Sequence, residues 1–133
     1  MFELHPRLIA ETVTVMDWPL CRVLLMNDST YPWLVLVPRQ KDIAEITDLS
    51  PQDQLVLMAE IAKASTGLRA LTTPHRINVA ALGNMVAQLH VHVIARFTDD
   101  PAWPKAVWGA APTVNYTADT LAAKLAELRD VLG

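Results

Sequence analysis

The feature of this 133-residue chain that most limits its fold is a series of short apolar segments separated by turn-forming residues. The segments are residues 9–16, 20–26, 33–37, 76–82 and 89–97. Their lengths and β-branched residues are typical of strands, with residues 9–16 as a shorter edge strand. Asn27, Asp28 and Pro32 lie between the second and third segments, and Gly83 and Asn84 between the last two. The sequence therefore predicts two β-hairpins.

A helix is predicted to follow the first hairpin. Ser50 supplies a capping hydroxyl, and Pro51 and Asp53 suit the first turn. We expect this helix to continue to about residue 71, before Thr72, Thr73 and Pro74 end it. Its apolar side chains recur every three or four residues, which predicts that they pack on the sheet. They are Leu55, Met58, Ala59 and Ala62.

A second helix is predicted at the end of the chain, after an irregular segment at residues 98–112 that is rich in proline, tryptophan and aspartate. Thr117 is its expected cap, and a leucine stripe at helical spacing follows. The stripe consists of Leu121, Leu125, Leu128 and Leu132. Strands that outnumber helices and are joined as hairpins indicate the α+β class, with an antiparallel sheet carrying helices on one face. We expect residues 1–133 to form a single domain.

Composition restricts the classes of function. Apolar residues make up 52% of the chain and charged residues 19%, with a net charge of −3, so no broad basic surface for nucleic acid is expected. Cys21 is the single cysteine, which excludes an internal disulfide and any site of paired cysteines and fits a cytoplasmic protein. No signal-peptide core is expected at the start of the chain, nor a run of membrane-spanning length. A small phosphorylated ligand remains compatible with this composition.

The stretch of residues 88–94 carries the candidate chemistry. In a strand, Gln88, His90 and His92 would share one face and Leu89 and Val91 the other. Two imidazoles and an amide on one face of an apolar strand indicate a ligand site. Two alternatives stay open: a solvated outer face, and a metal site that would need a third ligand. The predicted pairing puts His75 opposite about residue 96, too far from His92 to be that ligand.

The same stretch resembles the motif of the histidine triad (HIT) family, in which three histidines are separated by single hydrophobic residues. The resemblance covers residues 23–97. Beyond the motif, it includes the loop with Asn27, Asp28 and Pro32, the phrase LVLVPRQ, the helix after Ser50 and the segment RINVAALGN. It implies an α+β fold with one helix on the sheet and a C-terminal helix. It also implies a homodimer, with which the apolar excess agrees.

The activity implied by this resemblance is that of a nucleotide hydrolase or nucleotidyl transferase. His90, at the middle position, would attack the α-phosphate of a dinucleoside polyphosphate or a nucleotide phosphoramidate and form a nucleotidyl-histidine intermediate. His92 would contact the phosphate and stabilise its developing charge. We expect no cofactor and no metal, and a small-molecule nucleotide and a second copy of the chain are the expected partners. Neither a nucleic acid nor a membrane is expected as a partner.

This sequence departs from the family pattern at two positions. Gln88 stands where the first histidine is expected, and glutamine donates a hydrogen bond but carries no proton for a leaving group. Met85 stands where many relatives have a phosphate-contacting serine or threonine. These departures leave two alternatives open: a nucleotide-binding protein with little or no catalysis, and a histidine-based metal-binding protein.

Five further residues are candidates for substrate binding. Asn27 and Asp28 fall where the family holds the ribose hydroxyls, although both are also ordinary turn residues. Asn78 and Asn84 are candidates to reach the phosphate, and Gly83 allows backbone N–H groups to approach an anion. Two aromatic side chains from the irregular segment either cover the pocket or lie in a dimer interface. They are Trp103 and Trp108.

Overall fold

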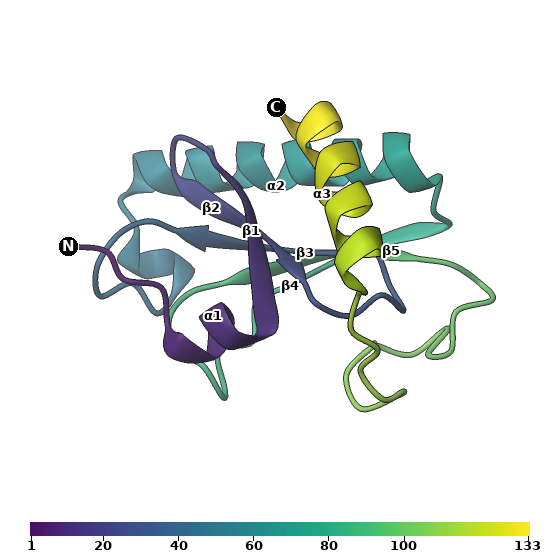
Figure 1. The fold of residues 1–133 in the computed structure, drawn as a ribbon. Helices are drawn as coiled ribbons and strands as arrows, with labels where there is room; N and C mark the ends of the chain where they lie inside the picture. The colour runs from purple at the N-terminus through teal and green to yellow at the C-terminus, as the bar shows by residue number, and fades with distance from the viewer.

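The computed structural model describes residues 1–133 and contains one five-stranded sheet with the strand order β1-β2-β3-β5-β4 (Figure 1). The elements are α1 (Pro6–Glu11), β1 (Thr12–Asp17), β2 (Cys21–Met26), β3 (Trp33–Pro38), a 3₁₀ turn (Ile46–Asp48), α2 (Pro51–Thr72), β4 (Arg76–Ala80), β5 (Val91–Arg96) and α3 (Ala118–Leu132). All neighbouring strands pair antiparallel. The predicted α+β class and antiparallel sheet are confirmed.

The central strands β3 and β5 divide their side chains between two apolar clusters. Leu34 and Leu36 of β3 join the cluster beneath α2 and α3. Val35 lies in the opposite cluster, and it is paired with His92 of β5. Because paired residues of antiparallel strands project from the same face, His92 points away from α2. The register thus places this imidazole on the face without the long helices.

The long helix α2 packs on the sheet through a different face from the one that the sequence predicted. Ser50 accepts the backbone N–H of Asp53 as its cap, as expected. The predicted stripe is exposed, however, with Leu55 74% and Met58 64% accessible. The buried face instead consists of Leu57, Glu60, Ala64, Gly67 and Leu68. Both stripes have helical spacing, and the prediction was wrong because Glu60 and Gly67 masked the apolar character of the buried one.

Glu60 is buried for a specific reason. Its two carboxylate oxygens accept the backbone N–H groups of Leu20 and Cys21, at 2.9 and 2.8 Å, at the start of β2. These bonds satisfy a charge that would otherwise be costly to bury. The free Cys21 beside it is fully buried, and burial, together with the Glu60 carboxylate, raises the pKa of its thiol.

The C-terminal helix α3 crosses α2 and approaches it closely, as Figure 1 shows. Leu128 and Leu132 of the predicted stripe are buried, whereas Leu121 and Leu125 pack at the edge of the cluster. The last turn is tied to the sheet because the Trp18 indole N–H donates to the Leu132 carbonyl, at 3.2 Å. Thr117 caps the helix as predicted.

The first part of the expected edge strand is a helix. Residues 9–11 belong to α1, where His5 Nδ1 accepts the Arg7 N–H and Pro6 stands in the first turn. This local cap and the burial of Leu8 outweigh the alternating pattern that predicted a strand. The strand itself begins at Thr12 and lies at the sheet edge, as expected. In Figure 1, α1 lies on the opposite side of the sheet from α2.

Strands β4 and β5 pair with Arg76 opposite Arg96, but the link between them is longer than a tight turn. Residues 81–90 are irregular, so Gln88 and His90 precede β5 rather than belonging to it. The segment from residue 97 to Thr117 is also irregular, as predicted. None of the helices has both the length and the apolar character that a membrane crossing requires.

Candidate active site

A cavity of about 500 Å³ opens on the face of the sheet opposite α2. It is bounded by β5, α1, the loop after β2, the link before β5 and the irregular segment before α3. Most of the residues predicted to form a site line it together. They are Asn27, Asp28, Gly83, Asn84, His90 and His92. Segments far apart in the sequence thus meet around the two histidines.

The first of these histidines is held in one tautomer by a backbone carbonyl. His90 Nδ1 lies 2.7 Å from the carbonyl oxygen of Gln88. A carbonyl oxygen only accepts hydrogen bonds, so Nδ1 carries a hydrogen. In the neutral form of His90 the lone pair is then on Nε2, the ring nitrogen away from the Gln88 carbonyl, where it can act as a nucleophile.

The second histidine is held in the opposite tautomer by an indole. Trp33 Nε1–H donates to His92 Nδ1 at 3.0 Å, and because indole is a donor only, the hydrogen of His92 is on Nε2. Burial, followed by the proximity of His90, lowers the pKa of His92 to about 4. The ring centroids of the two histidines are 5.0 Å apart. One imidazole thus offers a lone pair and its neighbour an N–H group.

Trp108 forms an aromatic wall beside the histidines. Its ring stands edge-on to His92 with 5.0 Å between centroids, and to Trp33 with 5.9 Å between centroids. The sequence allowed two positions for Trp108, over the pocket or in a dimer interface. In the structure it lines the cavity. Trp103 lies elsewhere, against His75 with 5.1 Å between ring centroids.

Asn27 and Asp28 line the cavity and also hold the segment before α3. Asn27 Oδ1 accepts the N–H of Tyr116 at 3.0 Å. Asp28 Oδ1 accepts the N–H groups of Thr30 and Val114, at 3.1 and 3.3 Å. Their turn role and their place in the cavity therefore coexist, and these bonds fix the carboxylate of Asp28 while using only one of its oxygens.

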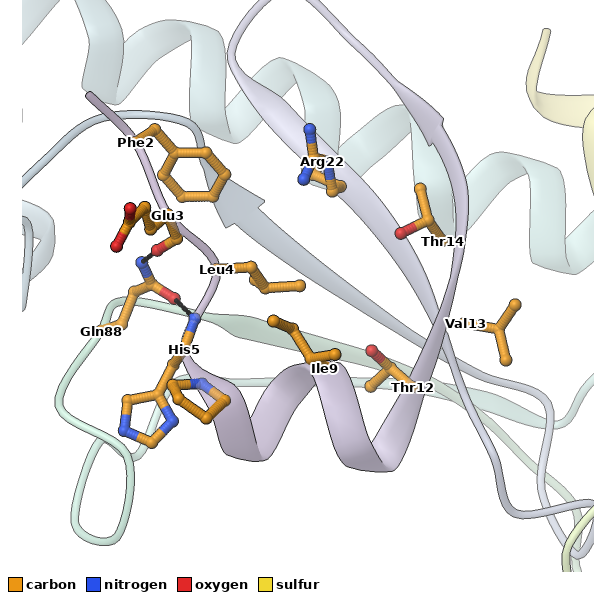
Figure 2. A pocket seen from close by; sticks show the side chains of 11 residues that line it. Phe2, Glu3, Leu4, His5, Ile9, Thr12, Val13, Thr14, Arg22 and Gln88 are labelled. Carbon is orange, nitrogen blue, oxygen red and sulfur yellow. Dashed lines mark hydrogen bonds between the residues drawn. The ribbon is translucent and has the colours of Figure 1, made fainter.

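Two predicted site residues lie outside the cavity. Asn78 Oδ1 accepts a hydrogen bond from the buried Arg96 at 2.8 Å, and Arg96 Nε donates to Asp100. Gln88 Oε1 accepts the His5 N–H at 2.8 Å, and its Nε2 donates to the Glu3 carbonyl at 2.9 Å (Figure 2). The prediction that Gln88 shares a strand face with the two histidines is wrong, because the chain at residue 88 is not in a strand.

The N-terminal segment held by Gln88 separates two hollows. On one side lies an open groove of about 980 Å³ against the β1 edge, drawn in Figure 2. On the other side, α1 contributes a wall of the histidine cavity. Its residues there were missed by the sequence analysis, as were two polar residues before α3. They are Arg7, Leu8, Ala10, Glu11, Thr113 and Asn115. The pairing of His5 with Pro6 was the available signal for this helix.

The structure provides no metal-ligand cluster at the histidines. No three side chains of the histidine, cysteine, aspartate or glutamate type come together in an arrangement suited to an ion. His5 faces the open groove, and His75 packs on Trp103. The metal-binding alternative therefore finds no third ligand among these groups.

Comparison with known proteins identifies a family and a curated relative. The family model described as HIT domain matches residues 8–99. AP-4-A phosphorylase of Mycobacterium tuberculosis (strain H37Rv) is 29% identical over 100 residues, covering 68% of this chain and 51% of that protein. The chain thus spans about half the length of the curated relatives it matches.

Two solved structures match almost the whole chain. The histidine triad protein of Bradyrhizobium japonicum is 44% identical with a TM-score of 0.96, covering 99% of this chain and 98% of that one. The histidine triad protein of Marinobacter aquaeolei VT8 is 48% identical, also with a TM-score of 0.96, covering 99% and 96%. Since the family model spans most of the residues and the fold agrees with these structures, the chain belongs to the HIT domain family.

Proposed function

We propose that this protein is a nucleotide hydrolase or nucleotidyl transferase that works through a nucleotidyl-histidine intermediate on His90. The observation that carries the proposal is the bond between His90 Nδ1 and the Gln88 carbonyl, at 2.7 Å, which leaves Nε2 as a lone-pair nucleophile in a cavity. A dinucleoside polyphosphate and a nucleotide phosphoramidate are the two candidate substrate classes. The similarity to AP-4-A phosphorylase supports a substrate of the nucleotide type.

The proposed reaction has two displacements at the α-phosphorus. First, His90 Nε2 forms a P–N bond while the bond from phosphorus to the leaving group breaks, and the leaving group keeps the electron pair. Water then attacks phosphorus, the P–N bond breaks with its electron pair returning to Nε2, and the proton that the water loses passes to the solvent. His92 Nε2–H donates to a phosphate oxygen in both transition states. An acceptor other than water would make the same sequence a transfer.

The remaining cavity residues suit the rest of a nucleotide. Asp28 has one carboxylate oxygen that accepts none of the bonds to the segment before α3, and an oxygen of this kind can accept from a ribose hydroxyl. Gly83 has a φ of 71° in the link before β5, beside Asn84. Such a backbone turn favours N–H groups that point at an anion.

The decisive test is the replacement His90→Ala, with release of AMP from a dinucleoside polyphosphate and from adenosine phosphoramidate as the readout. We expect a loss of at least about a thousandfold, because the covalent step requires this nitrogen. His75→Ala is the matched control, since His75 lies against Trp103 outside the cavity. Mass spectrometry of rapidly denatured protein should detect a nucleotidyl adduct on His90. An active His90→Ala protein would reject the proposal.

A nucleotide-binding protein with little catalysis is the second candidate. It is favoured by the position of Gln88, whose side chain is occupied by the backbone of Glu3 and His5 and not by the cavity. Calorimetry distinguishes the candidates: AMP binding with no product from any substrate supports the binder.

Self-association and location complete the proposal. Strand β4 lies at a sheet edge, and Val79 and Leu82 are about half exposed beside it, so a second copy of the chain could cover them. We propose a homodimer, which light scattering after gel filtration would detect as twice the chain mass. The single, buried Cys21 suits the proposed cytoplasmic location.

A further inference from the structure

The side chain of Gln88 connects the histidine motif to the N-terminal helix. Its amide binds the backbone on both sides of Leu4, accepting from the His5 N–H and donating to the Glu3 carbonyl (Figure 2). His5 is also the cap of α1, so the position of that helix depends on this contact. A protonated imidazole in place of the amide could not accept a hydrogen bond from the backbone N–H. The glutamine thus has a structural role that a protonated histidine at this position could not fill.

No titratable side chain in the cavity lining is placed to donate a proton. The groups are Arg7, Glu11, Asp28, His90 and His92. His90 gives its Nδ1–H to the Gln88 carbonyl. Burial, followed by the proximity of His90, lowers the pKa of His92 to about 4, and its Nδ1 accepts the Trp33 N–H. Asp28 accepts two backbone N–H groups, and Glu11 accepts from Arg7 at 3.0 Å. Arginine does not act as an acid at ordinary pH.

Arg7 brings a permanent positive charge to the cavity instead. It lies on α1, on the face that lines the histidine cavity. Its Nε binds Glu11, and the two terminal nitrogens of the guanidinium have no partner in the protein. A guanidinium with two free nitrogens matches the oxygens of a phosphate group. The position of α1, and with it Arg7, depends on the contacts of Gln88 with Glu3 and His5.

We propose that Gln88 is a positioning residue that holds α1 so that Arg7 binds a departing polyphosphate as an anion, in place of a proton donor at the first triad position. This inference rests on the proposed function and deepens it, because it selects nucleoside polyphosphates over nucleotide phosphoramidates. When His90 Nε2 attacks the α-phosphorus of a polyphosphate, the broken P–O bond leaves its electron pair on a terminal phosphate oxygen. The terminal nitrogens of Arg7, which are not used in its pair with Glu11, donate hydrogen bonds to that oxygen, so no proton is needed.

An amine leaving group differs in its chemistry. The broken P–N bond leaves an electron pair on nitrogen, and the amine departs readily only if that nitrogen takes up a proton. Because the cavity lining provides no proton donor, phosphoramidate turnover should be slow. We expect kcat/KM for diadenosine tetraphosphate to exceed that for adenosine phosphoramidate by about a hundredfold or more, the usual contribution of general acid catalysis.

The test compares three substrates that share an AMP half: diadenosine tetraphosphate, adenosine phosphoramidate and the p-nitrophenyl ester of AMP. The nitrophenolate needs neither a proton nor a second charge from the enzyme. Arg7→Ala should therefore lower the polyphosphate rate relative to the ester rate by about tenfold or more, and Arg7→Lys should recover part of that ratio. Arg69→Ala, on the exposed side of α2, is the matched control and should leave both rates as in the wild type.

The role of Gln88 is tested with Gln88→Ala and the double variant. If Gln88 acts through Arg7, then Gln88→Ala lowers the same ratio of polyphosphate rate to ester rate. The variant with both Gln88→Ala and Arg7→Ala should then lower this ratio no further than Arg7→Ala alone. Circular dichroism confirms that each variant is folded. Equal losses on all three substrates, additive losses in the double variant, or phosphoramidate turnover as fast as polyphosphate turnover would overturn the inference.

The proposed function fails separately from this inference. If His90→Ala abolishes AMP release while Arg7→Ala affects every substrate alike, the nucleotidyl-histidine pathway stands and the role of Arg7 is wrong. If His90→Ala releases AMP as well as the wild type does, or if the wild type cleaves none of the three substrates, both proposals are rejected.

Discussion

At the level of single side chains, two neighbouring imidazoles carry their hydrogens on different ring nitrogens, because each Nδ1 atom has a different hydrogen-bond partner. The carbonyl that faces His90 Nδ1 accepts a hydrogen, whereas the indole that faces His92 Nδ1 donates one. Each partner binds the Nδ1 atom of its ring and so determines whether Nε2 of a neutral ring has a hydrogen or a lone pair. The two rings are therefore complementary: the neutral form of His90 offers a lone pair on Nε2, and His92 offers an N–H group on Nε2.

The role of Trp33 can be tested with Trp33→Phe, which keeps an aromatic ring but removes the N–H group. Burial lowers the pKa of His92 to about 4, and the Trp33 N–H opposes protonation of Nδ1, so loss of this donor should raise the pKa of His92 above that value. We expect kcat to fall by about tenfold at neutral pH and to fall further toward pH 5 in the variant, but not in the wild type. The measurement is the pH profile of kcat.

Trp103→Phe is the control for this prediction, because the Trp103 ring packs on His75 away from the cavity. Its pH profile should follow the wild type. Superimposable profiles for Trp33→Phe and the wild type would show that the indole does not determine the state of His92.

At the level of elements, the helix layer depends on how closely α2 and α3 approach. Gly67 lies at the crossing, where an added Cβ would overlap the Leu132 side chain. Leu132 is fully buried and its carbonyl accepts from Trp18, so it has little freedom to move. The glycine in the middle of a long helix is thus required by packing and not by backbone conformation.

Gly67→Ala is predicted to destabilise the protein although alanine is the better helix former. The helix propensity gain is about 1 kcal/mol, and overpacking at the crossing should cost about 1 to 3 kcal/mol and exceed it. Urea unfolding measures the difference. Met58→Ala on the exposed face of α2 is the control and should change stability by less than about 0.5 kcal/mol. If Gly67→Ala were more stable than the wild type, the argument that the crossing of α2 and α3 leaves no room for a Cβ would be wrong.

For the whole molecule, the buried histidine connects folding to pH. In the unfolded chain His92 has an ordinary pKa of 6.5, whereas in the folded protein burial lowers the pKa to about 4. Between these values the unfolded state binds more protons than the folded state, so stability falls as the pH falls through this window. The free energy of unfolding should be about 3 kcal/mol lower at pH 4 than above pH 6.5.

Urea unfolding of the wild type and His92→Asn at several values between pH 7 and pH 4 tests this prediction. The variant should show a smaller loss of stability across the window, because asparagine does not titrate. Asp100 does not interfere there, since the Arg96 guanidinium lowers the pKa of this carboxyl to about 2, so its contribution is lost only at more acid pH. Parallel pH curves for the two proteins would contradict the burial argument.

The sequence was a good guide where a local signal decides the structure. The Ser50 and Thr117 caps begin the two long helices at the predicted residues, because a capping hydroxyl acts on N–H groups within the next turn. It was a poor guide for the face of α2. There, Leu55 and Leu57 are equally apolar, and only the packing partners determine which of them is buried.

By itself, the sequence determined the α+β class, most of the strand segments, the caps of the two long helices and the choice of two histidines as candidate site residues, because these depend on near neighbours in the chain. Only the tertiary structure decided that Gln88 binds the N-terminal segment, that α1 with Arg7 walls the cavity and that Trp33 supports His92. These contacts join residues that lie more than fifty positions apart. Such pairings depend on the closing of the whole sheet, which no local pattern encodes.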